Sequence, residues 1–320
     1  MRVFIQSLGD GYETAIARGF EFLGPAGTIR TSDRIAIKPN LTFPTYRPGV
    51  MTSLEALIAL VTYLKNFTDN ITICESDSGG YNPFSMDEVF RNTGITEFAH
   101  RMGVRIVNMS HTPSRPIRFR RRFRTMSVPL PTLLLDETDL FITMPVPKVH
   151  MNTIVSLGLK NQWGVIQEPA LRLKLHPFFK EVIYQVNKAL PKTVVVVDGK
   201  YGLTRSGPMR GDVLDLNWIL ISDNLFASDR IVSEMMGFDW RSIPYIRYAL
   251  KREEIRSVGE IQFNCDYKAF RNENFYLVRQ WTDYPGVMTF NSRALAYFGY
   301  ESILAKPLHW LLYRFREPFY

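Results

Sequence analysis

Two lysines, a histidine and an asparagine follow a short apolar run near the middle of the chain. The run, residues 140–144, is typical of a buried strand, and the prolines directly after it end the strand. Lys148 and His150 are therefore expected just beyond that end, with Lys160 and Asn161 following. In open α/β sheets, ligands bind in the crevice beyond the carboxyl ends of the strands. The segment therefore predicts a ligand site.

The chemistry of this site suits a small anion. Lys38, Lys148 and Lys160 can neutralise a phosphate or a carboxylate, and a buried lysine can have its pKa lowered enough to act as a base. His150 or His176 can move a proton near neutral pH. We therefore expect an enzyme that acts on a small anionic metabolite, with Lys148, His150, Lys160 and His176 as its catalytic residues. These residue types do not name the reaction.

Polar residues also follow the other predicted strands. They are Lys38 and Asn40 after residues 34–37, Glu75 and Asp77 after residues 70–74, and Asp198 after residues 193–197. Because parallel strands present their carboxyl ends at one edge of a sheet, we expect these residues, together with Asn161, to bind the substrate. The three carboxylates have two alternative roles. They can form salt bridges with the lysines that only order the loops, or they can hold a hard cation such as magnesium.

Strands alternate with helices along the chain. This order predicts an α/β fold with a mainly parallel sheet, in which mixed pairing stays open, and helices on both faces. Ser53 is expected to cap an amphipathic helix over residues 54–65, and a further helix is expected near residues 153–160. The pattern weakens from about residue 260. We therefore expect a core domain of residues 1–260 and an aromatic-rich C-terminal extension, residues 261–320, packed on it.

The composition limits the cofactors and the compartment. The chain has 320 residues and two cysteines, Cys74 and Cys265, which lie far apart in the sequence. An iron–sulfur cluster and a cysteine zinc site are excluded by ligand count, whereas a divalent cation and an organic cofactor stay open. No apolar run is long enough to cross a bilayer, and the first residues are typical of a strand rather than a signal peptide. We expect a cytoplasmic, reduced protein.

Much of the net charge of +8 comes from one arginine-rich segment. Six arginines lie between residues 115 and 124, where arginines and apolar residues alternate. The period of two predicts an edge strand or a hairpin with one cationic face. Arg118–Arg124 can bind nucleic acid, an anionic membrane surface or an acidic protein, or the charges only keep an exposed edge from aggregating. A non-catalytic binding protein is therefore the rival of the enzyme hypothesis.

The C-terminal segments 294–300 and 307–316 are rich in aromatic residues that lie near arginines. We expect a terminal helix docked on the protein's own core. A contact between two copies of the chain, or with a membrane surface, is the alternative.

Several short motifs occur in a fixed order along the chain. They are Ile37-Lys38-Pro39-Asn40, Glu75-Ser76-Asp77, Pro147-Lys148-Val149-His150, Gly158-Leu159-Lys160-Asn161, Asp198-Gly199, Gly207-Pro208 and Ala227-Ser228-Asp229. This set resembles the uncharacterised domain-of-unknown-function family 362 over roughly residues 30–255. The resemblance implies an α/β fold and no agreed activity. Many relatives carry ferredoxin-like cysteine motifs after this domain, which implies redox work. Because those motifs are missing from this sequence, a redox protein here would depend on an external electron-transfer partner or a bound cofactor.

Overall fold

The computed structural model describes residues 1–78, 84–300, 302–305, 307 and 310–311. Its strands are β1 (Arg2–Ser7), β2 (Ile35–Pro39), β3 (Ile71–Glu75), β4 (Arg105–Asn108), β5 (Ser114–Arg121), β6 (Arg124–Pro131), β7 (Leu140–Met144), β8 (Lys148–His150), β9 (Ile154–Ser156), β10 (Lys192–Thr204), β11 (Asp212–Ser222) and β12 (Gln262–Phe263). Its helices are α1 (Gly11–Leu23), α2 (Leu54–Leu64), α3 (Met86–Asn92), α4 (Ile95–Met102), α5 (Thr132–Leu135), α6 (Gly158–Asn161), α7 (Pro169–Leu175), α8 (Phe179–Ala189), α9 (Leu225–Met235), α10 (Pro244–Arg252), α11 (Tyr284–Asn291) and α12 (Arg293–Tyr300).

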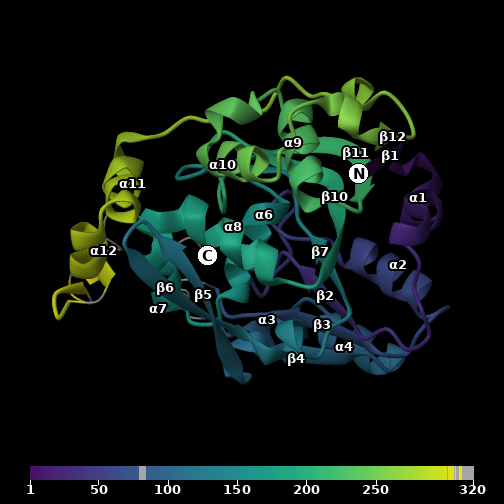
Figure 1. Cartoon of the computed structure of the whole chain (residues 1–320), viewed down its shortest axis with the longest axis horizontal. Coiled ribbons are helices and arrows are strands. Elements are labelled where there is room, and N and C mark those ends of the chain that lie inside the picture. The colour runs from purple at the N-terminus through teal and green to yellow at the C-terminus, as the bar shows by residue number, and fades with distance from the viewer. Residues whose placement is uncertain (79–83, 301, 306, 308–309, 312–320) are drawn as a thin grey trace.

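One sheet of ten strands organises the described part of the chain (Figure 1). Its main path runs β12-β1-β11-β10-β7-β2-β3-β4. The strands from β10 to β4 pair parallel, whereas β11 pairs antiparallel with both β10 and β1. The short strands β8 and β9 extend from β10. The prediction of a mainly parallel α/β sheet is confirmed, and the pairing is mixed.

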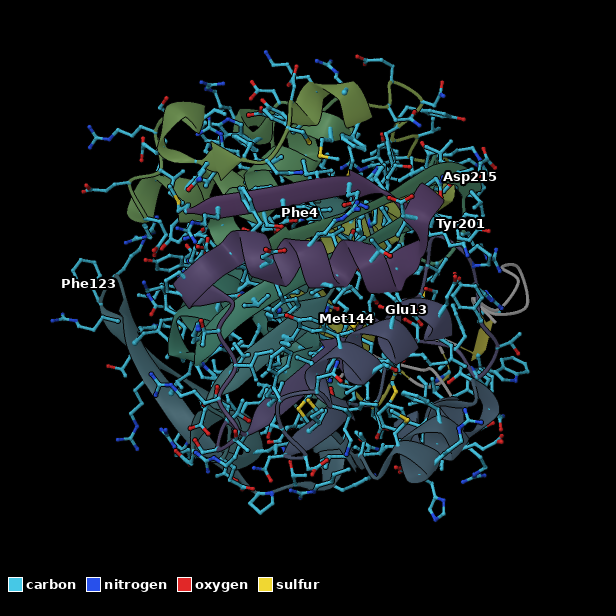
Figure 2. All side chains as sticks on the ribbon, turned by 90° about the vertical axis from the view of Figure 1, so that its right-hand side faces the viewer. Phe4, Glu13, Phe123, Met144, Tyr201 and Asp215 are labelled. Atoms are coloured by element: carbon cyan, nitrogen blue, oxygen red, sulfur yellow. The ribbon has the colours of Figure 1, made fainter. Side chains whose placement is uncertain are left out.

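Helices cover both faces of this sheet because its central strands are buried on both sides. All five residues of β2 and of β7 are buried, and successive side chains point to opposite faces. Ile35 and Ile37 join one apolar cluster with α1, α2 and α4, whereas Ala36 joins a second cluster with α8, α9 and α10. Figure 2 looks onto the first face, with α1 and α2 in front of the strands. Ser53 caps α2 as expected, since its hydroxyl accepts a hydrogen bond from the Ala56 N–H.

Two local predictions were wrong, and each error has a physical cause. Asp198 does not end its strand, because β10 continues to Thr204 through an irregularity between Gly199 and Tyr201 and pairs along β11. Lys148 and His150 follow the end of β7, as expected, and they form a further strand, β8, which is held by pairing to β9 and to the extended part of β10. The helix expected over residues 153–160 starts only at residue 158, because residues 154–156 form β9.

The chain beyond residue 260 first adds to the sheet and then leaves it. β12 pairs parallel with β1, and Ile261, Tyr267 and Phe275 are buried in the same cluster as α9. α12 then packs against α7, and α11 packs against residues 176–178, on the side of the molecule that also carries β5 and β6 (Figure 1). Most of the predicted aromatic segment 307–316 lies outside the described residues. None of the described helices combines the length and the apolar character that a bilayer crossing requires.

Candidate functional site

Lys38 and Glu75 meet at the carboxyl ends of the neighbouring strands β2 and β3. The Lys38 ammonium lies 2.7 Å from a Glu75 oxygen, and both side chains are buried. The Ser76 N–H donates to the other Glu75 oxygen at 2.9 Å. The chain packs tightly over the pair at Gly164, where a Cβ would lie 2.8 Å from the Glu75 Oε1 and 3.0 Å from the Lys38 Nζ. Lys38 and Glu75 are therefore a buried ion pair that neutralises itself.

Asn161 connects this pair to β7. Its side-chain oxygen lies 3.5 Å from the Lys38 Nζ, and its amide donates to the Thr143 hydroxyl at 2.9 Å. The short helix α6, which carries Asn161, is held by Asp229 of α9, whose two oxygens accept from the N–H groups of Gly158 and Leu159 at 2.8 and 2.9 Å. Burial raises the pKa of Asp229 to about 8, although the two backbone donors oppose the shift.

Lys148 lies beside the ion pair without a carboxylate of its own. Its side chain is 4% exposed, and its ammonium donates to the Val50 carbonyl at 2.6 Å. Burial lowers the pKa of Lys148 to about 7, with further lowering by the charges of Lys160 and Lys38 and partial compensation by Glu75. A lysine in this position is divided between its charged and neutral forms at physiological pH.

Lys160 projects from α6 and is half-buried. Its ammonium lies 5.6 Å from the centre of the Phe179 ring and makes no hydrogen bond or ion pair with any described residue. Burial lowers the pKa of Lys160 to about 8, and the nearby Arg172 charge adds to this effect. Lys160 is thus a second cation of this region that has no carboxylate partner within the described chain.

His150 of β8 lies near the two lysines. Its Nδ1 accepts a hydrogen bond from the Asn152 N–H at 3.1 Å, which leaves the proton of the neutral ring on Nε2. Burial lowers the pKa of His150 well below its usual range, and the charges of Lys160 and other nearby cations lower it further. His150 is therefore neutral at physiological pH and offers an Nε2–H donor.

His176 lies within an aromatic cluster next to Lys160. Its ring centre is 5.2 Å from Phe179, 4.4 Å from Phe290 and 5.8 Å from Trp163. Burial lowers the pKa of His176 to about 3, and the charge of Lys160 contributes. Its Nδ1 is buried and has no hydrogen-bond partner among the described residues. The His176 ring therefore stays neutral at physiological pH and packs against one side of the site. Its pKa does not suit proton transfer near neutral pH.

Arg172 of α7 was missed by the sequence reasoning, because nothing in its local sequence marks it. Its guanidinium donates to the Ile166 carbonyl at 2.6 Å, the Asp77 carbonyl at 2.7 Å and the Ser76 hydroxyl at 2.5 Å. Burial lowers the pKa of Arg172 to about 10. Arg172 fastens the segment after α6 onto the end of β3, and its charge adds to the positive potential at Lys160.

The motifs that build this site also identify the family. Residues 35–234 match the family described as a domain of unknown function, DUF362, and this range contains Lys38, Glu75, Lys148, Lys160 and Asp229. The chain belongs to the DUF362 family. The resemblance seen in the sequence motifs is thereby confirmed.

Three known proteins show the extent of the similarity outside the DUF362 match. A thylakoid-associated protein of Synechocystis sp. is 25% identical over 238 residues, which are 70% of each chain. The lactate racemase apoprotein of Thermoanaerobacterium thermosaccharolyticum superposes with a TM-score of 0.43 at 14% identity, over 70% of this chain and 54% of that one. A Thermotoga maritima protein gives 0.39 at 13% identity, over 58% and 50%. The chain therefore spans about half the length of these two solved structures.

Two carboxylates of the DUF362 motifs do not face the lysines. One Asp77 oxygen accepts from the Met86 N–H at 2.7 Å and from the Asn108 amide at 3.1 Å, so it anchors the start of α3. Asp198 accepts from the Tyr12 hydroxyl and, at 2.8 Å, from the Ser53 N–H, so it anchors α1 and α2. These contacts favour a structural role for both residues over the substrate-binding role expected from the sequence.

Asn40 remains available for a ligand. Its main chain pairs with Thr52, whose hydroxyl accepts from the Asn40 N–H at 2.8 Å. Its side-chain amide makes no hydrogen bond with a described residue and is partly exposed. No group of three acidic, histidine or cysteine side chains within the described ranges could hold a metal ion, so the divalent cation considered from the sequence has no ligand set there.

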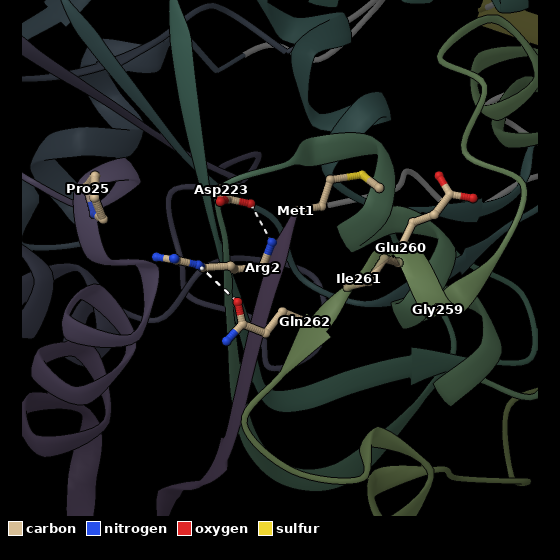
Figure 3. A pocket seen from close by; sticks show the side chains of 8 residues that line it. All are labelled: Met1, Arg2, Pro25, Asp223, Gly259, Glu260, Ile261 and Gln262. Carbon is tan, nitrogen blue, oxygen red and sulfur yellow. Dashed lines mark hydrogen bonds between the residues drawn. The ribbon is translucent and has the colours of Figure 1, made fainter.

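A cavity of about 560 Å³ lies elsewhere, at the amino-terminal edge of the sheet (Figure 3). There the Arg2 N–H donates to Asp223 at 2.7 Å, and the Arg2 guanidinium donates to Gln262 at 3.3 Å. Arg2 begins β1, which runs in the direction of β10, so this cavity faces away from the carboxyl ends of the parallel strands. Arg2 bonds to both Asp223 and Gln262, and the cavity does not belong to the lysine site.

Proposed function

We propose that the protein is an enzyme that binds a small anionic metabolite, a carboxylate or a phosphate, between Lys148, Lys160 and His150 and transfers a proton to or from it. The observation that carries this proposal is the lack of a carboxylate bonded to either lysine within the described chain. The charge of Lys160 lowers the pKa of the buried Lys148, and Glu75 is already paired with Lys38. An anion would supply the missing negative charge.

The three residues have distinct roles in this proposal. Lys160 provides a positive charge for the anion, and the neutral His150 donates its Nε2–H to an anion oxygen. Lys148 exchanges the proton, because a pKa of about 7 allows it to act as an acid or as a base at physiological pH. Asp229 and Asn161 act as positioning residues, since they hold α6 in place.

The location of the protein is also a proposal. Cys74 and Cys265 are both free thiols, which supports a reducing compartment such as the cytoplasm. The relative from Synechocystis is described as thylakoid-associated, and that description belongs to that protein.

Replacing Lys160 with methionine is expected to weaken the binding of small anions by about 100-fold, because it removes a partly buried charge that makes a charge-assisted contact. The measurement is equilibrium binding of a panel of small phosphates and carboxylates to the wild-type protein and the variant. Lys65→Met is a matched control, since Lys65 pairs with Asp69 on the surface of α2. Equal affinities of wild type and Lys160→Met for every anion that binds would contradict the proposal.

A further inference from the structure

The arginine-rich segment is a hairpin of β5 and β6 that projects from the molecule. The strands pair from Ser114–Pro131 to Arg121–Arg124, and the turn consists of Arg122 and Phe123. The Phe123 side chain is 98% exposed and points away from the body of the protein (Figure 2). An apolar ring in this position is costly in water, so the tip is a candidate contact surface.

The outward face of this hairpin is cationic and has no internal counterions. Arg118 and Arg120 lie on this face, Arg122 lies in the turn, and Arg124 lies opposite Arg121; all four are exposed, and none of the four guanidinium groups bonds to a described residue. Residues 112–135 contain no aspartate or glutamate. A solvated edge that needs only charges to prevent aggregation does not require an exposed phenylalanine among them.

One arginine of the segment points inward and holds the hairpin in place. The Arg121 guanidinium lies 3.5 Å from a Glu181 oxygen of α8 and 4.3 Å from the centre of the Phe178 ring. Ile117 and Phe119 on the same side pack against the core. The tip is therefore presented by a hairpin that is fixed along its inner face.

α12 lies beside the hairpin tip and extends the same surface. A cavity of about 680 Å³ separates the two elements and is lined by the tip together with Phe178, Arg293 and Tyr297. Residues 284–300 contain no aspartate or glutamate. Large apolar side chains are exposed along this region: Trp281, Tyr284, Met288, Leu295, Tyr297, Phe298, Ile303 and Leu304.

We propose that the hairpin–α12 surface, residues 118–124 and 293–298, docks the protein on an anionic lipid bilayer. The arginines would bind lipid phosphates, and Phe123 with the apolar side chains of α12 would enter the boundary between headgroups and acyl chains. Charge complementarity favours an anionic partner. Among anionic partners, a bilayer also offers an apolar layer for side chains such as Leu295 and Phe298, which a nucleic acid backbone does not.

The test is co-sedimentation of the full chain with vesicles of phosphatidylglycerol and phosphatidylcholine, compared with pure phosphatidylcholine. We expect binding to the anionic vesicles only, and weaker binding as salt increases. Arg120→Gln with Arg122→Gln should lower the partition coefficient about 30-fold, since each basic residue near such a surface contributes about 1 kcal/mol. Phe123→Ser should lower it about tenfold.

The matched controls lie in or near α1 and α2, at the other end of the molecule in Figure 1. Arg18→Gln with Arg30→Gln removes the same charge, and Phe67→Ser removes a side chain that is 40% exposed. These variants should bind as wild type does. The proposal is overturned if the hairpin variants bind as tightly as the controls. It is also overturned if the wild type does not bind anionic vesicles. This includes the outcomes in which the protein binds duplex DNA or RNA instead, or only forms dimers through this surface.

Discussion

Glu75→Gln is expected to destabilise the protein by about 3–5 kcal/mol, because it leaves the Lys38 ammonium buried without its counterion. The Lys38 side chain is 1% exposed, so water cannot replace the lost carboxylate. The side-chain oxygen of Asn161 lies 3.5 Å from the Lys38 Nζ and is a weak substitute for the carboxylate. Chemical denaturation measures the loss as a lower free energy of unfolding.

The double variant Lys38→Met with Glu75→Gln is the control for this prediction. It removes both charges, so most of the lost stability should return. If the loss of stability in the double variant equalled the sum of the losses in Glu75→Gln and in Lys38→Met, the two residues would act independently. The ion pair would then not explain the result.

Lys148→Met is expected to have the opposite effect on stability while it abolishes turnover. Folding lowers the pKa of Lys148 from its ordinary 10.5 to about 7. Between these values the unfolded chain holds a proton that the folded protein does not, so this group makes stability rise with pH across the window. Below about pH 7 Lys148 is charged in both the folded and the unfolded protein, so the folded protein bears the full cost of burying this charge. Methionine removes this cost.

We therefore expect Lys148→Met to raise the free energy of unfolding by about 1–3 kcal/mol at neutral pH, after the loss of the hydrogen bond to the Val50 carbonyl. The stability of the variant should also rise less with pH between about 7 and 10.5 than that of the wild type. Lys65→Met should change neither quantity. A large loss of stability in Lys148→Met would mean that Lys148 holds the fold together, as a salt-bridge role requires.

The parallel part of the sheet and its polar edge could be predicted from local patterns. The apolar runs ending at Lys38 and at Glu75 are neighbouring parallel strands, and the polar side chains at their carboxyl ends meet. Each strand carries its own signal in a few consecutive residues. The convergence of Lys38 with Glu75 follows from that signal and from the general rule for parallel strands.

The rest of the site depends on pairing between distant segments, which local patterns do not show. Asp198 followed by glycine resembles a strand end, yet β10 continues because β11 pairs with it as far as Asp212. β8 exists because the Leu203 N–H donates to the Pro147 carbonyl and β9 pairs on its other side. Asp229 caps α6 from a helix 71 residues away in the sequence. The sequence shows Asp229 as part of a motif, but it does not show that Asp229 bonds to α6.

We propose that an anion binds where Lys148 and Lys160 lack a carboxylate partner within the described chain. Calorimetric titration with malonate and with sulfate, in two buffers of different ionisation enthalpy at about pH 7.5, tests it most directly, because neither probe titrates there. An anion raises the pKa of Lys148 from about 7 and that of Lys160 from about 8, so we expect binding with net proton uptake, and clearly smaller uptake in Lys148→Met. Binding without proton uptake, or the same uptake in Lys148→Met, would show that the anion does not bind next to Lys148.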